Sequence, residues 1–415
     1  MRLLVITPHF SPDTAPTGVI VTELVNSWCK KGHQVHVITS LPWYENHEVV
    51  DDWKNCFIKK TINGSVEITR VYPFPNKKSN LFIRGLGFMG FSLLVSILSI
   101  FSKGPFDAVY ALSPPITLGT AGKVASMRHR CPLVFNVQDI FPDAAIETGV
   151  FSSKLLIRVA KIFEKISYHS SELITVLSQD MRENINGKLF DSKKTPVVSV
   201  MPNFALSEFF HTDEENKYKK ENCLEGKIVV MYAGNLGYSQ PLELIVDSAK
   251  AHLDNEDLIY VVNGGGVKTD YLKREARVIR NLVFVEYQPF ERLPEVLSSA
   301  DIHLVILKSG LGDVSVPSKI YNIFASGKPV VVSVDPGTEL ERLVLEAEAG
   351  FVVAPDEPDA FHEAIRKLSD DSSLRDKMGE SAQMAAKKWY SAEAVSDLYI
   401  ESIKELKTNN NESLP

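Results

Sequence analysis

Short apolar runs alternate with longer stretches of helical periodicity along the whole chain, and this alternation constrains the fold more than any other feature. The runs in the first half lie at residues 3–7, 35–39, 66–72, 108–111, 133–137, 174–176 and 197–200. Those in the second half lie at residues 228–232, 258–262, 282–285, 302–306, 330–334 and 351–353. Such a pattern is typical of βαβ units, in which helices cover both faces of a parallel sheet. We therefore predict an α/β protein built from doubly wound domains.

A polar, highly charged segment at residues 206–226 interrupts this alternation. The 415 residues agree with two domains, because a domain usually has roughly 100–200 residues. We predict a first domain over residues 1–205, a linker over 206–226 and a second domain over 227–390. Apolar residues at helical spacing then predict a long amphipathic helix over 391–407.

The composition excludes several classes of protein. The net charge of −7, from 45 Lys and Arg against 52 Asp and Glu, gives no basic field for a nucleic acid. The four cysteines are scattered without the spacing of a zinc site, which favours a reducing compartment. Only four apolar residues follow Arg2, too few for the core of a signal peptide. We therefore expect a cytoplasmic protein with no nucleic-acid partner.

The segment from Gly85 to Ser102 is uncharged and rich in large apolar residues. It approaches the ~20 residues that span a bilayer. A true span would place the strands at 66–72 and 108–111 on opposite sides of the membrane, so we expect none. Two alternatives remain: a core helix, or a helix whose outer face lies in the membrane interface beside Lys103 and other nearby cations. The breadth of the apolar face favours the membrane interface.

Two places in the first half could bind an anion or a sugar. Gly18 ends a long loop just before a helical pattern starts at Val19, so its amide and the helix N-terminus could hold a phosphate. The alternative is a simple turn. Gln138, Asp139 and Asp143 follow a buried strand, where open α/β sheets bind ligands, and acids there could bind sugar hydroxyls or transfer protons. A helix N-cap is the alternative for either aspartate.

Two glycine-rich loops follow successive strands of the second half. The first contains Gly234, Asn235 and Gln240, and the second contains Gly265. Each alone is a weak signal, since tight turns also use glycine. Because they end neighbouring strand units, the pair favours a nucleotide pocket.

The most informative stretch runs from residue 310 to residue 330. Its pattern predicts a short helix whose N-terminus carries Ser318 and Lys319 and which ends near Gly327. Backbone amides, a hydroxyl and one ammonium could there bind a diphosphate, and Asn322, one turn later, could reach a ribose. A solvated helix without a ligand is the alternative.

Taken together, these segments resemble the retaining GT-B-fold glycosyltransferases of family 4, in the branch of bacterial colanic-acid, capsule and O-antigen biosynthesis that includes L-fucosamine transferases. The resemblance is carried by residues 16–18, 137–142, 200–203, 232–235, 316–322 and 327–329. It implies two Rossmann-like domains that face each other across a cleft. The first would bind the acceptor, the second would bind the nucleotide sugar, and the last helix would pack back on the first domain.

The resemblance also implies roles for individual residues. The donor diphosphate would contact Thr17 and Gly18 as well as the helix start at Lys319, its base would contact the loop at Gln288, and its sugar would face Asp139. The remaining substrate contacts would come from Gln138, Gly234, Asn235, Gln240, Gly265, Ser318, Asn322 and Gly337. Asp139 and Lys319 would be the catalytic residues.

The sequence departs from the wider family at two places. Asn235 and Gln240 stand where many members have an Arg and a Lys, and Val314 and Asn322 stand where many have two Glu. Lys319 then becomes the cation expected to compensate. The sequence contains no DxD motif, so we expect no metal ion and no other cofactor.

The expected activity is retaining transfer from a nucleotide sugar to a lipid-linked saccharide in bacterial surface polysaccharide biosynthesis. By resemblance, the donor is a UDP-sugar carrying an N-acetylated amino or 6-deoxy sugar, and the acceptor is a polyprenyl-diphosphate-linked glycan. The enzyme would be cytoplasmic or peripheral on the inner face of the membrane, which it would contact through residues 85–102. A sugar-nucleotide epimerase of the same architecture and a non-catalytic sugar-nucleotide or glycan-binding protein are the alternatives. The loop after the first strand is not a GxGxxG motif, which disfavours a nicotinamide-dependent enzyme.

Overall fold

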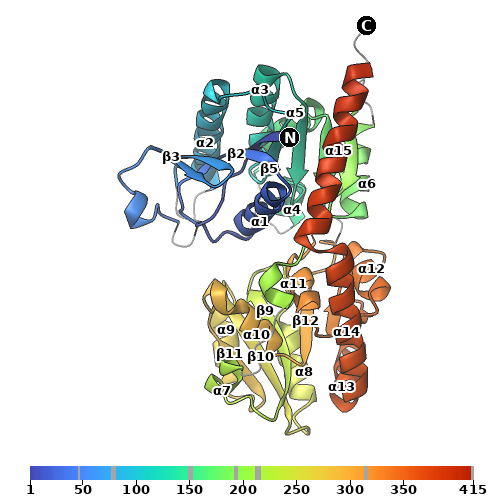
Figure 1. Ribbon diagram of the computed structural model, residues 1–415. Helices are drawn as coiled ribbons and strands as arrows, with labels where there is room; N and C mark the ends of the chain where they lie inside the picture. Colours follow the sequence, from blue (N-terminus) through green and yellow to red (C-terminus); the bar gives the residue numbers. More distant parts are fainter. Residues whose placement is uncertain are drawn as a thin grey trace. The chain divides into compact units, whose positions relative to one another are not determined.

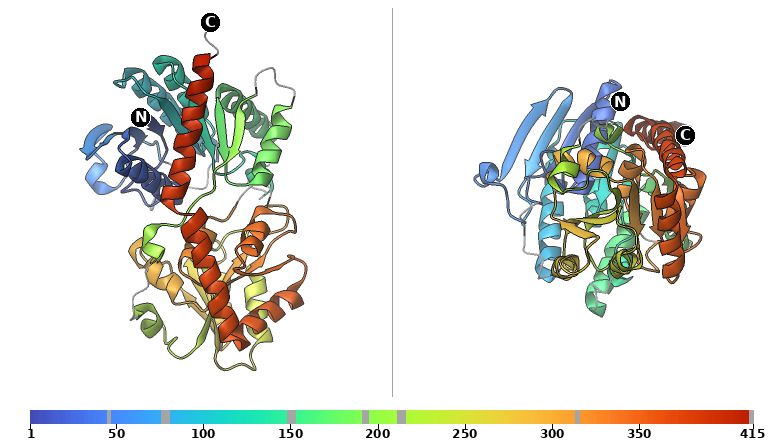
Figure 2. Two further views of the ribbon diagram at one scale, coloured as in Figure 1. Left: turned by 45° about the vertical axis from the view of Figure 1, so that its right-hand side comes forward. Right: turned by 90° about the horizontal axis from the view of Figure 1, so that it is seen from below.

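The computed structural model describes residues 1–44, 47–75, 81–147, 153–190, 195–210, 216–312 and 316–412 (Figure 1). They form two compact units. Unit 1 comprises Met1–Pro202 and Ala392–Pro415, and unit 2 comprises Asn203–Ser391. Each unit has a central sheet with helices packed on its faces, as the two views of Figure 2 show. The predicted fold class, two Rossmann-like α/β domains, is confirmed.

The sheet of unit 1 has eight strands in the order β3-β4-β2-β1-β5-β6-β7-β8. Their bounds are β1 Arg2–Ile6, β2 Gln34–Ser40, β3 Ile58–Asn63, β4 Val66–Val71, β5 Ala108–Ser113, β6 Leu133–Val137, β7 Leu173–Val176 and β8 Val197–Val200. All pairs are parallel except β3 with β4. The seven predicted runs form the parallel strands. Strand β3 was not predicted, because this exposed edge strand carries polar residues and lacks a buried face.

The helices of unit 1 include one from the far end of the chain. Their bounds are α1 Pro16–Lys30, η1 Asp51–Trp53, α2 Leu81–Phe101, α3 Leu118–His129, α4 Asp143–Glu147, α5 Lys154–Ser170, α6 Gln179–Leu189 and α15 Ala392–Glu412. Helix α15 packs on α1, where the indole of Trp28 donates to the carbonyl of Ser396 at 3.3 Å. The hydroxyl of Tyr399 accepts from the buried amide of Asn136 at 2.8 Å. These contacts make α15 part of unit 1.

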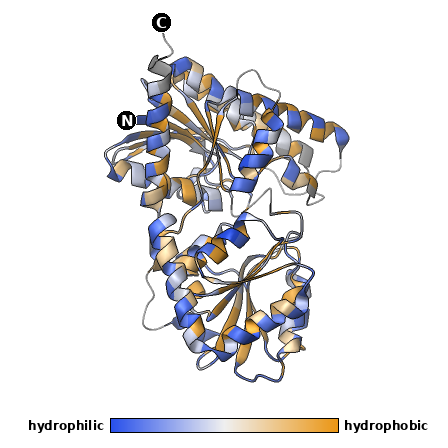
Figure 3. Cartoon of the chain, turned by 90° about the vertical axis from the view of Figure 1, so that its right-hand side faces the viewer, coloured by the Kyte–Doolittle hydropathy of each residue, from blue (hydrophilic) through white to orange (hydrophobic). Residues whose placement is uncertain are grey.

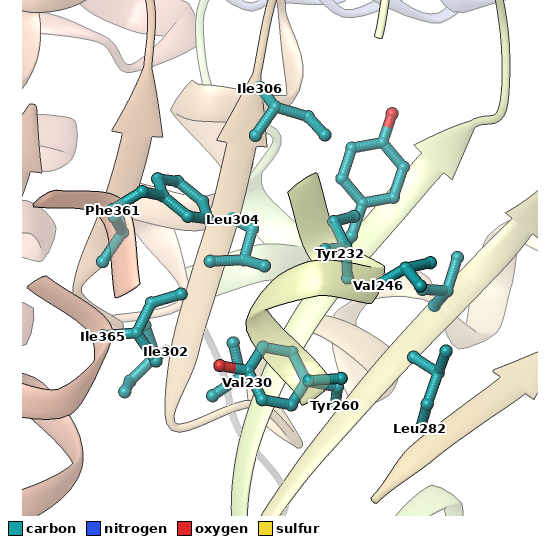
Figure 4. Packing of buried hydrophobic residues seen from close by; sticks show 14 of the residues in the cluster. Val230, Tyr232, Val246, Tyr260, Leu282, Ile302, Leu304, Ile306, Phe361 and Ile365 are labelled. Atoms are coloured by element: carbon teal, nitrogen blue, oxygen red, sulfur yellow. The ribbon is translucent and has the colours of Figure 1, made fainter. Parts of the chain in front are cut away.

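The sheet of unit 2 is entirely parallel, with six strands in the order β11-β10-β9-β12-β13-β14. Their bounds are β9 Ile228–Asn235, β10 Leu258–Gly265, β11 Leu282–Val285, β12 Ile302–Ile306, β13 Val330–Ser333 and β14 Gly350–Val353. Figure 4 shows the core on one face, where Val230, Tyr260 and Leu304 of the strands pack with Phe361. In Figure 3 the strands of both sheets are mostly hydrophobic, as the buried apolar runs require.

The described helices of unit 2 are η2 Ser207–Phe210, α7 Lys217–Glu221, α8 Glu243–Ala251, α9 Thr269–Ala276, η3 Phe290–Arg292, α10 Leu293–Ser298, α11 Lys319–Ala325, α12 Glu339–Glu346, α13 Pro358–Asp370 and α14 Ser372–Trp389. The predicted linker at 206–226 is wrong over its described residues, which belong to this unit. Tyr218 is fully buried, its hydroxyl donates to the side chain of Asn263 at 2.9 Å, and Asn216 donates to the carbonyl of Glu295 at 2.9 Å. One buried tyrosine thus fixes a segment whose composition is polar.

Helix α2 contains all of the uncharged segment from Gly85 to Ser102 except its last residue. Its inner face is core, with Phe91 and Val95 buried, whereas its outer face exposes Leu93 and Ile97 to solvent. Across the described residues, no helix is long and apolar enough to cross a membrane. The inner face of this helix is therefore core, and contact of the outer face with a membrane stays a prediction.

Candidate functional site

In unit 2, strands β9 and β10 end side by side in glycine loops. Gly264 pairs with Gly234 across the two strands. A β-carbon built on Gly264 would lie 2.0 Å from the carbonyl oxygen of Gly234, so only glycine allows the two backbones to approach this closely. Gly234 itself has a φ of 141°, which disfavours any other residue. The predicted glycine loops thus leave backbone exposed at the carboxyl edge of the sheet, where such folds bind ligands.

The ammonium of Lys319, the first residue of α11, reaches this edge. Its Nζ lies 3.7 Å from the ring centroid of Tyr232 and donates to the carbonyl of Ala233 at 3.4 Å. A β-carbon on Gly234 would approach the same Nζ to 3.6 Å. The hydroxyl of Tyr232 in turn donates to the carbonyl of Asn235 at 2.8 Å. The structure therefore brings the predicted residues Gly234 and Lys319 together around a tyrosine that the sequence analysis had not selected.

The surroundings of Lys319 destabilise its charge. Burial lowers the pKa of this lysine from 10.5 to about 7. Within the described part of the chain, no carboxylate forms an ion pair with it. The aromatic face of Tyr232 and one carbonyl oxygen stabilise the cation only partly. An anionic group placed beside Nζ would therefore gain a strong, poorly screened partner.

Asn235 and Gln240 brace the first glycine loop. The side-chain oxygen of Gln240 accepts from the amide of Gly237 at 3.1 Å. A β-carbon on Gly237 would lie 2.7 Å from the side-chain nitrogen of Asn235, so both side chains fold over this glycine. They shape the loop and supply no charge.

The second glycine loop adjoins an exposed tyrosine. A β-carbon on Gly265 would lie 2.9 Å from the ring of Tyr287, so the ring rests directly against the glycine backbone. Beside it, the side-chain oxygen of Gln288 accepts from Arg292 at 3.2 Å, which holds the loop after β11 in place. This aromatic ring and the neighbouring amide offer a surface suited to a planar base.

Three further predicted residues of unit 2 have different surroundings. Ser318 caps α11 and is exposed, with no side-chain hydrogen bond to the helix. The side-chain oxygen of Asn322 accepts from the amide of Leu206 at 3.1 Å, so this residue ties 203–210 to α11. Its side-chain nitrogen keeps two N–H donors, and the predicted contact with a ribose stays a prediction. Gly337 lies in an exposed turn after β13 with a φ of 82°, and Val314 lies outside the described residues.

In unit 1, the expected start of the first helix at Val19 is wrong. Helix α1 begins at Pro16, so Thr17 and Gly18 lie inside its first turn. Gly18 is buried, and a β-carbon there would lie 2.8 Å from Cβ of His9. A glycine is therefore needed at position 18, because a larger residue would prevent the preceding loop from packing closely on the helix.

That loop holds a histidine–aspartate pair that the sequence analysis did not identify as a site. Nδ1 of His9 lies 2.7 Å from the carboxylate of the buried Asp13, whose other oxygen accepts from the amide of Tyr44 at 3.2 Å. The imidazole stacks on Trp43 with ring centroids 5.4 Å apart. The four-residue spacing was visible in the sequence, but the aromatic residues come from the loop after β2.

The residues after β6 have divided roles. The buried side-chain amide of Gln138 donates to the side-chain oxygen of Asn136 at 2.7 Å. Asn136 in turn donates to Tyr399 of α15. Asp139 follows it, half-buried at the carboxyl end of the strand, as predicted. Asp143 opens α4 and pairs with Lys188 at 2.8 Å, so its role is structural.

Comparison with protein families decides the class of the chain. Residues 17–200 match the family described as glycosyl transferase 4-like domain, and residues 213–385 match the family described as glycosyl transferases group 1. The chain is a glycosyltransferase of the GT-B type. The two matches fall in unit 1 and unit 2 respectively, so each unit of the glycosyltransferase has its own family assignment.

Two relatives of this glycosyltransferase are themselves named as glycosyltransferases, one of them for colanic acid biosynthesis. It is 26% identical over 380 residues to WcaI of Escherichia coli, named as a colanic acid biosynthesis glycosyl transferase, covering 88% of this chain and 92% of WcaI. It is 27% identical over 308 residues to the probable glycosyltransferase WbjE of Pseudomonas aeruginosa, covering 72% of this chain and 75% of WbjE. The glycosyltransferase is therefore related to this group of transferases.

Solved structures support the fold. Sucrose-phosphate synthase from Thermosynechococcus elongatus superposes with a TM-score of 0.75 at 14% identity, covering 99% of this chain and all of that one. HepE of Anabaena, solved with UDP and glucose, superposes with a TM-score of 0.67 at 16% identity, covering 98% of this chain and 100% of HepE. At these identities the similarity establishes the GT-B fold.

Proposed function

We propose that this glycosyltransferase moves a sugar from a UDP-sugar to a lipid-linked saccharide, with retention of anomeric configuration, in bacterial surface polysaccharide biosynthesis. The observation that carries the proposal is the position of the Lys319 ammonium, without a carboxylate partner among the described residues, at the glycine edge of the unit 2 sheet. The UDP and glucose bound to HepE and the name of WcaI support the choice of donor and pathway.

The donor contacts follow from the chemistry of each group. Lys319 would bind the diphosphate, Gly234 and Gly265 would let it approach the backbone, and the ring of Tyr287 with Gln288 would receive the uracil. Ser318 is exposed beside the lysine and offers a hydroxyl. We propose that this cation neutralises the leaving phosphate without a metal ion, since the sequence lacks a DxD motif.

The proposed reaction breaks the bond between C1 of the sugar and the phosphate oxygen. The acceptor oxygen forms the new bond to C1 on the same face, and its proton passes to the leaving diphosphate. The protein then positions the reactants and stabilises negative charge on the leaving group. Lys319 supplies that charge stabilisation, and Asp139 in unit 1 is proposed to orient the transferred sugar. An N-acetylated amino or 6-deoxy sugar is our proposed donor sugar.

We propose a polyprenyl-diphosphate-linked glycan as the acceptor. A lipid-linked acceptor requires the enzyme to work at a membrane surface, and the outer face of α2, with Leu93 and Ile97 exposed, offers an apolar contact for it. The proposed location is the inner face of the cytoplasmic membrane.

The deciding experiment measures transfer from a panel of UDP-, GDP-, ADP- and CMP-sugars to a membrane fraction or a synthetic polyprenyl-diphosphate acceptor, with and without EDTA. We expect transfer from a UDP-sugar, insensitive to EDTA, with the donor's anomeric configuration kept in the product by NMR. Inversion at C1 or a requirement for metal would contradict the mechanism. An isomerised donor without acceptor would show an epimerase, and donor binding without turnover would show a binding protein.

A further inference from the structure

Helix α5 of unit 1 has a solvent face made only of cations and apolar side chains. Lys154, Arg158, Lys161 and Lys165 are exposed, and between them lie exposed apolar residues such as Leu155 (68% exposed) and Ile162 (54% exposed). The single acid of the helix, Glu164, is buried and paired with Lys188 of α6. This local charge contrasts with a chain whose net charge is −7.

Helix α5 packs against α3, which in turn packs against α2. The hydroxyl of Ser92 in α2 hydrogen-bonds that of Thr117 just before α3 at 2.8 Å. The hydroxyl of Ser167 in α5 donates to the adjacent carbonyl of Ile116 at 2.8 Å. Helices α2 and α5 therefore both contact α3, and each of the three helices exposes apolar side chains, Met127 among them on α3.

The structure assigns α5 as an interfacial helix that docks this unit on an anionic phospholipid bilayer. A helix of 17 residues is about 25 Å long, enough to lie in the headgroup region with its apolar side chains inserted and its cations at the phosphates. Interleaved cations and large aliphatic residues fit this partner because a lipid surface offers negative charge and an apolar interior together. A shallow groove along α5, lined among others by Lys154, Ile157 and Arg158, keeps these cations accessible.

This assignment differs in kind from the apolar contact of α2, because it requires negative lipid. It rests on the proposed function only in explaining how the enzyme reaches a lipid-linked acceptor. Vesicle binding without donor or acceptor tests it separately. If vesicles do not bind but the enzyme transfers sugar to a short-chain soluble acceptor, the docking surface fails and the proposed function stands.

The experiment measures co-sedimentation of the full chain with vesicles of phosphatidylcholine alone and of phosphatidylcholine mixed with phosphatidylglycerol. We expect binding only to the anionic vesicles, weakening with salt. Each cation near a membrane contributes about fivefold, so the Arg158→Gln/Lys161→Gln variant should lose roughly 25-fold in partitioning. The matched control, Lys377→Gln/Lys387→Gln on α14, removes the same charge and should bind as the wild type does.

A second variant keeps the charge and removes the apolar contact. Leu155→Gln/Ile162→Gln changes two exposed side chains, so the fold should be unaffected by circular dichroism, while the binding that survives in high salt should be lost. Equal binding to neutral and anionic vesicles would overturn the assignment. So would an α5 charge variant that behaves like the control, or loss of binding only on Leu93→Gln/Ile97→Gln in α2.

Discussion

Replacing Lys319 by methionine should weaken donor binding and at the same time stabilise the ligand-free protein. The substitution keeps an unbranched chain of similar length against the ring of Tyr232 but removes the ammonium, whose pKa burial lowers to about 7. A residue with a purely structural role would not show these opposite effects. The pair of measurements therefore tests the function of this lysine and not only its packing.

The gain in stability follows from the pKa of Lys319 in the two states. The unfolded chain holds the proton up to a pKa of about 10.5, whereas the folded chain releases it above about 7. Stability therefore rises with pH between these values, and near pH 7 the folded state bears almost the full cost of burial. That cost is at most about 4 kcal/mol, which partial exposure and the cation–π contact reduce to about 2 kcal/mol. We expect Lys319→Met to raise the Tm by about 4–8 °C at pH 7 and by less as the pH approaches 10.5.

The loss in binding follows from the charge-assisted hydrogen bond to phosphate. Such a bond contributes about 1.5–3 kcal/mol, so the Kd of the UDP-sugar should rise roughly 10- to 150-fold. Calorimetry in buffers of different ionisation enthalpy gives a second readout. The bound lysine stays protonated, so wild-type binding should take up about half a proton at pH 7 and about 0.9 at pH 8. A nucleotide sugar has no phosphate group that titrates in this range.

The control is Lys377→Met on the exposed face of α14. This substitution should change the Tm by no more than about 1 °C and should leave the Kd of the UDP-sugar unchanged. Unchanged donor affinity in the Lys319→Met variant would refute the phosphate role. Binding without proton uptake at pH 8 would refute the argument from the lowered pKa.

Other substitutions test the architecture around the site. Gly264→Ala places a β-carbon 2.0 Å from the carbonyl oxygen of Gly234, so we expect a loss of at least about 2 kcal/mol in unfolding free energy by denaturant titration, with weaker UDP binding; a variant as stable as the wild type would contradict the strand approach. Tyr399→Phe removes the hydroxyl that accepts from buried Asn136 and should cost about 1–3 kcal/mol in the stability of unit 1 while the donor Kd stays unchanged; an altered Kd would speak against this. Asp13 holds the imidazole of His9, so Asp13→Asn tests whether this histidine acts on the acceptor. We expect a lower kcat at saturating donor and an unchanged donor Kd. An unchanged kcat would show that the pair of His9 and Asp13 is not part of the site.

The sequence predicted the strands of both sheets because buried parallel strands leave a direct record in apolar runs. It failed where tertiary contacts overrode composition. The segment around Tyr218 reads as a polar linker, yet one buried aromatic side chain and its hydrogen bonds make it part of unit 2. Strand β3 was not predicted because it is an exposed edge strand, which needs no apolar face and therefore leaves no apolar run in the sequence.

The site was predictable in its loops but not in its details. Residue type and position in the sequence were enough to select Gly234, Gly265 and Lys319. The contact of Lys319 with Tyr232 and Ala233 could not be predicted, because Ala233 lies 86 positions before the lysine in the sequence. Gly18 lies in the first turn of α1, where its lack of a side chain also allows close packing against His9, a contact that the sequence did not predict.

The resemblance to family 4 predicts an Arg and a Lys where the first glycine loop has Asn235 and Gln240, so the cation of our proposed donor site must come from another element. Asn235 and Gln240 now brace the loop through Gly237, a task for which neutral amides suffice. The cation enters from α11, where Lys319 reaches the end of β9. A protein that only used this region structurally would gain stability by replacing a half-buried lysine with an apolar residue. The presence of an ammonium at that cost is the physical argument for our proposal that this site binds an anion.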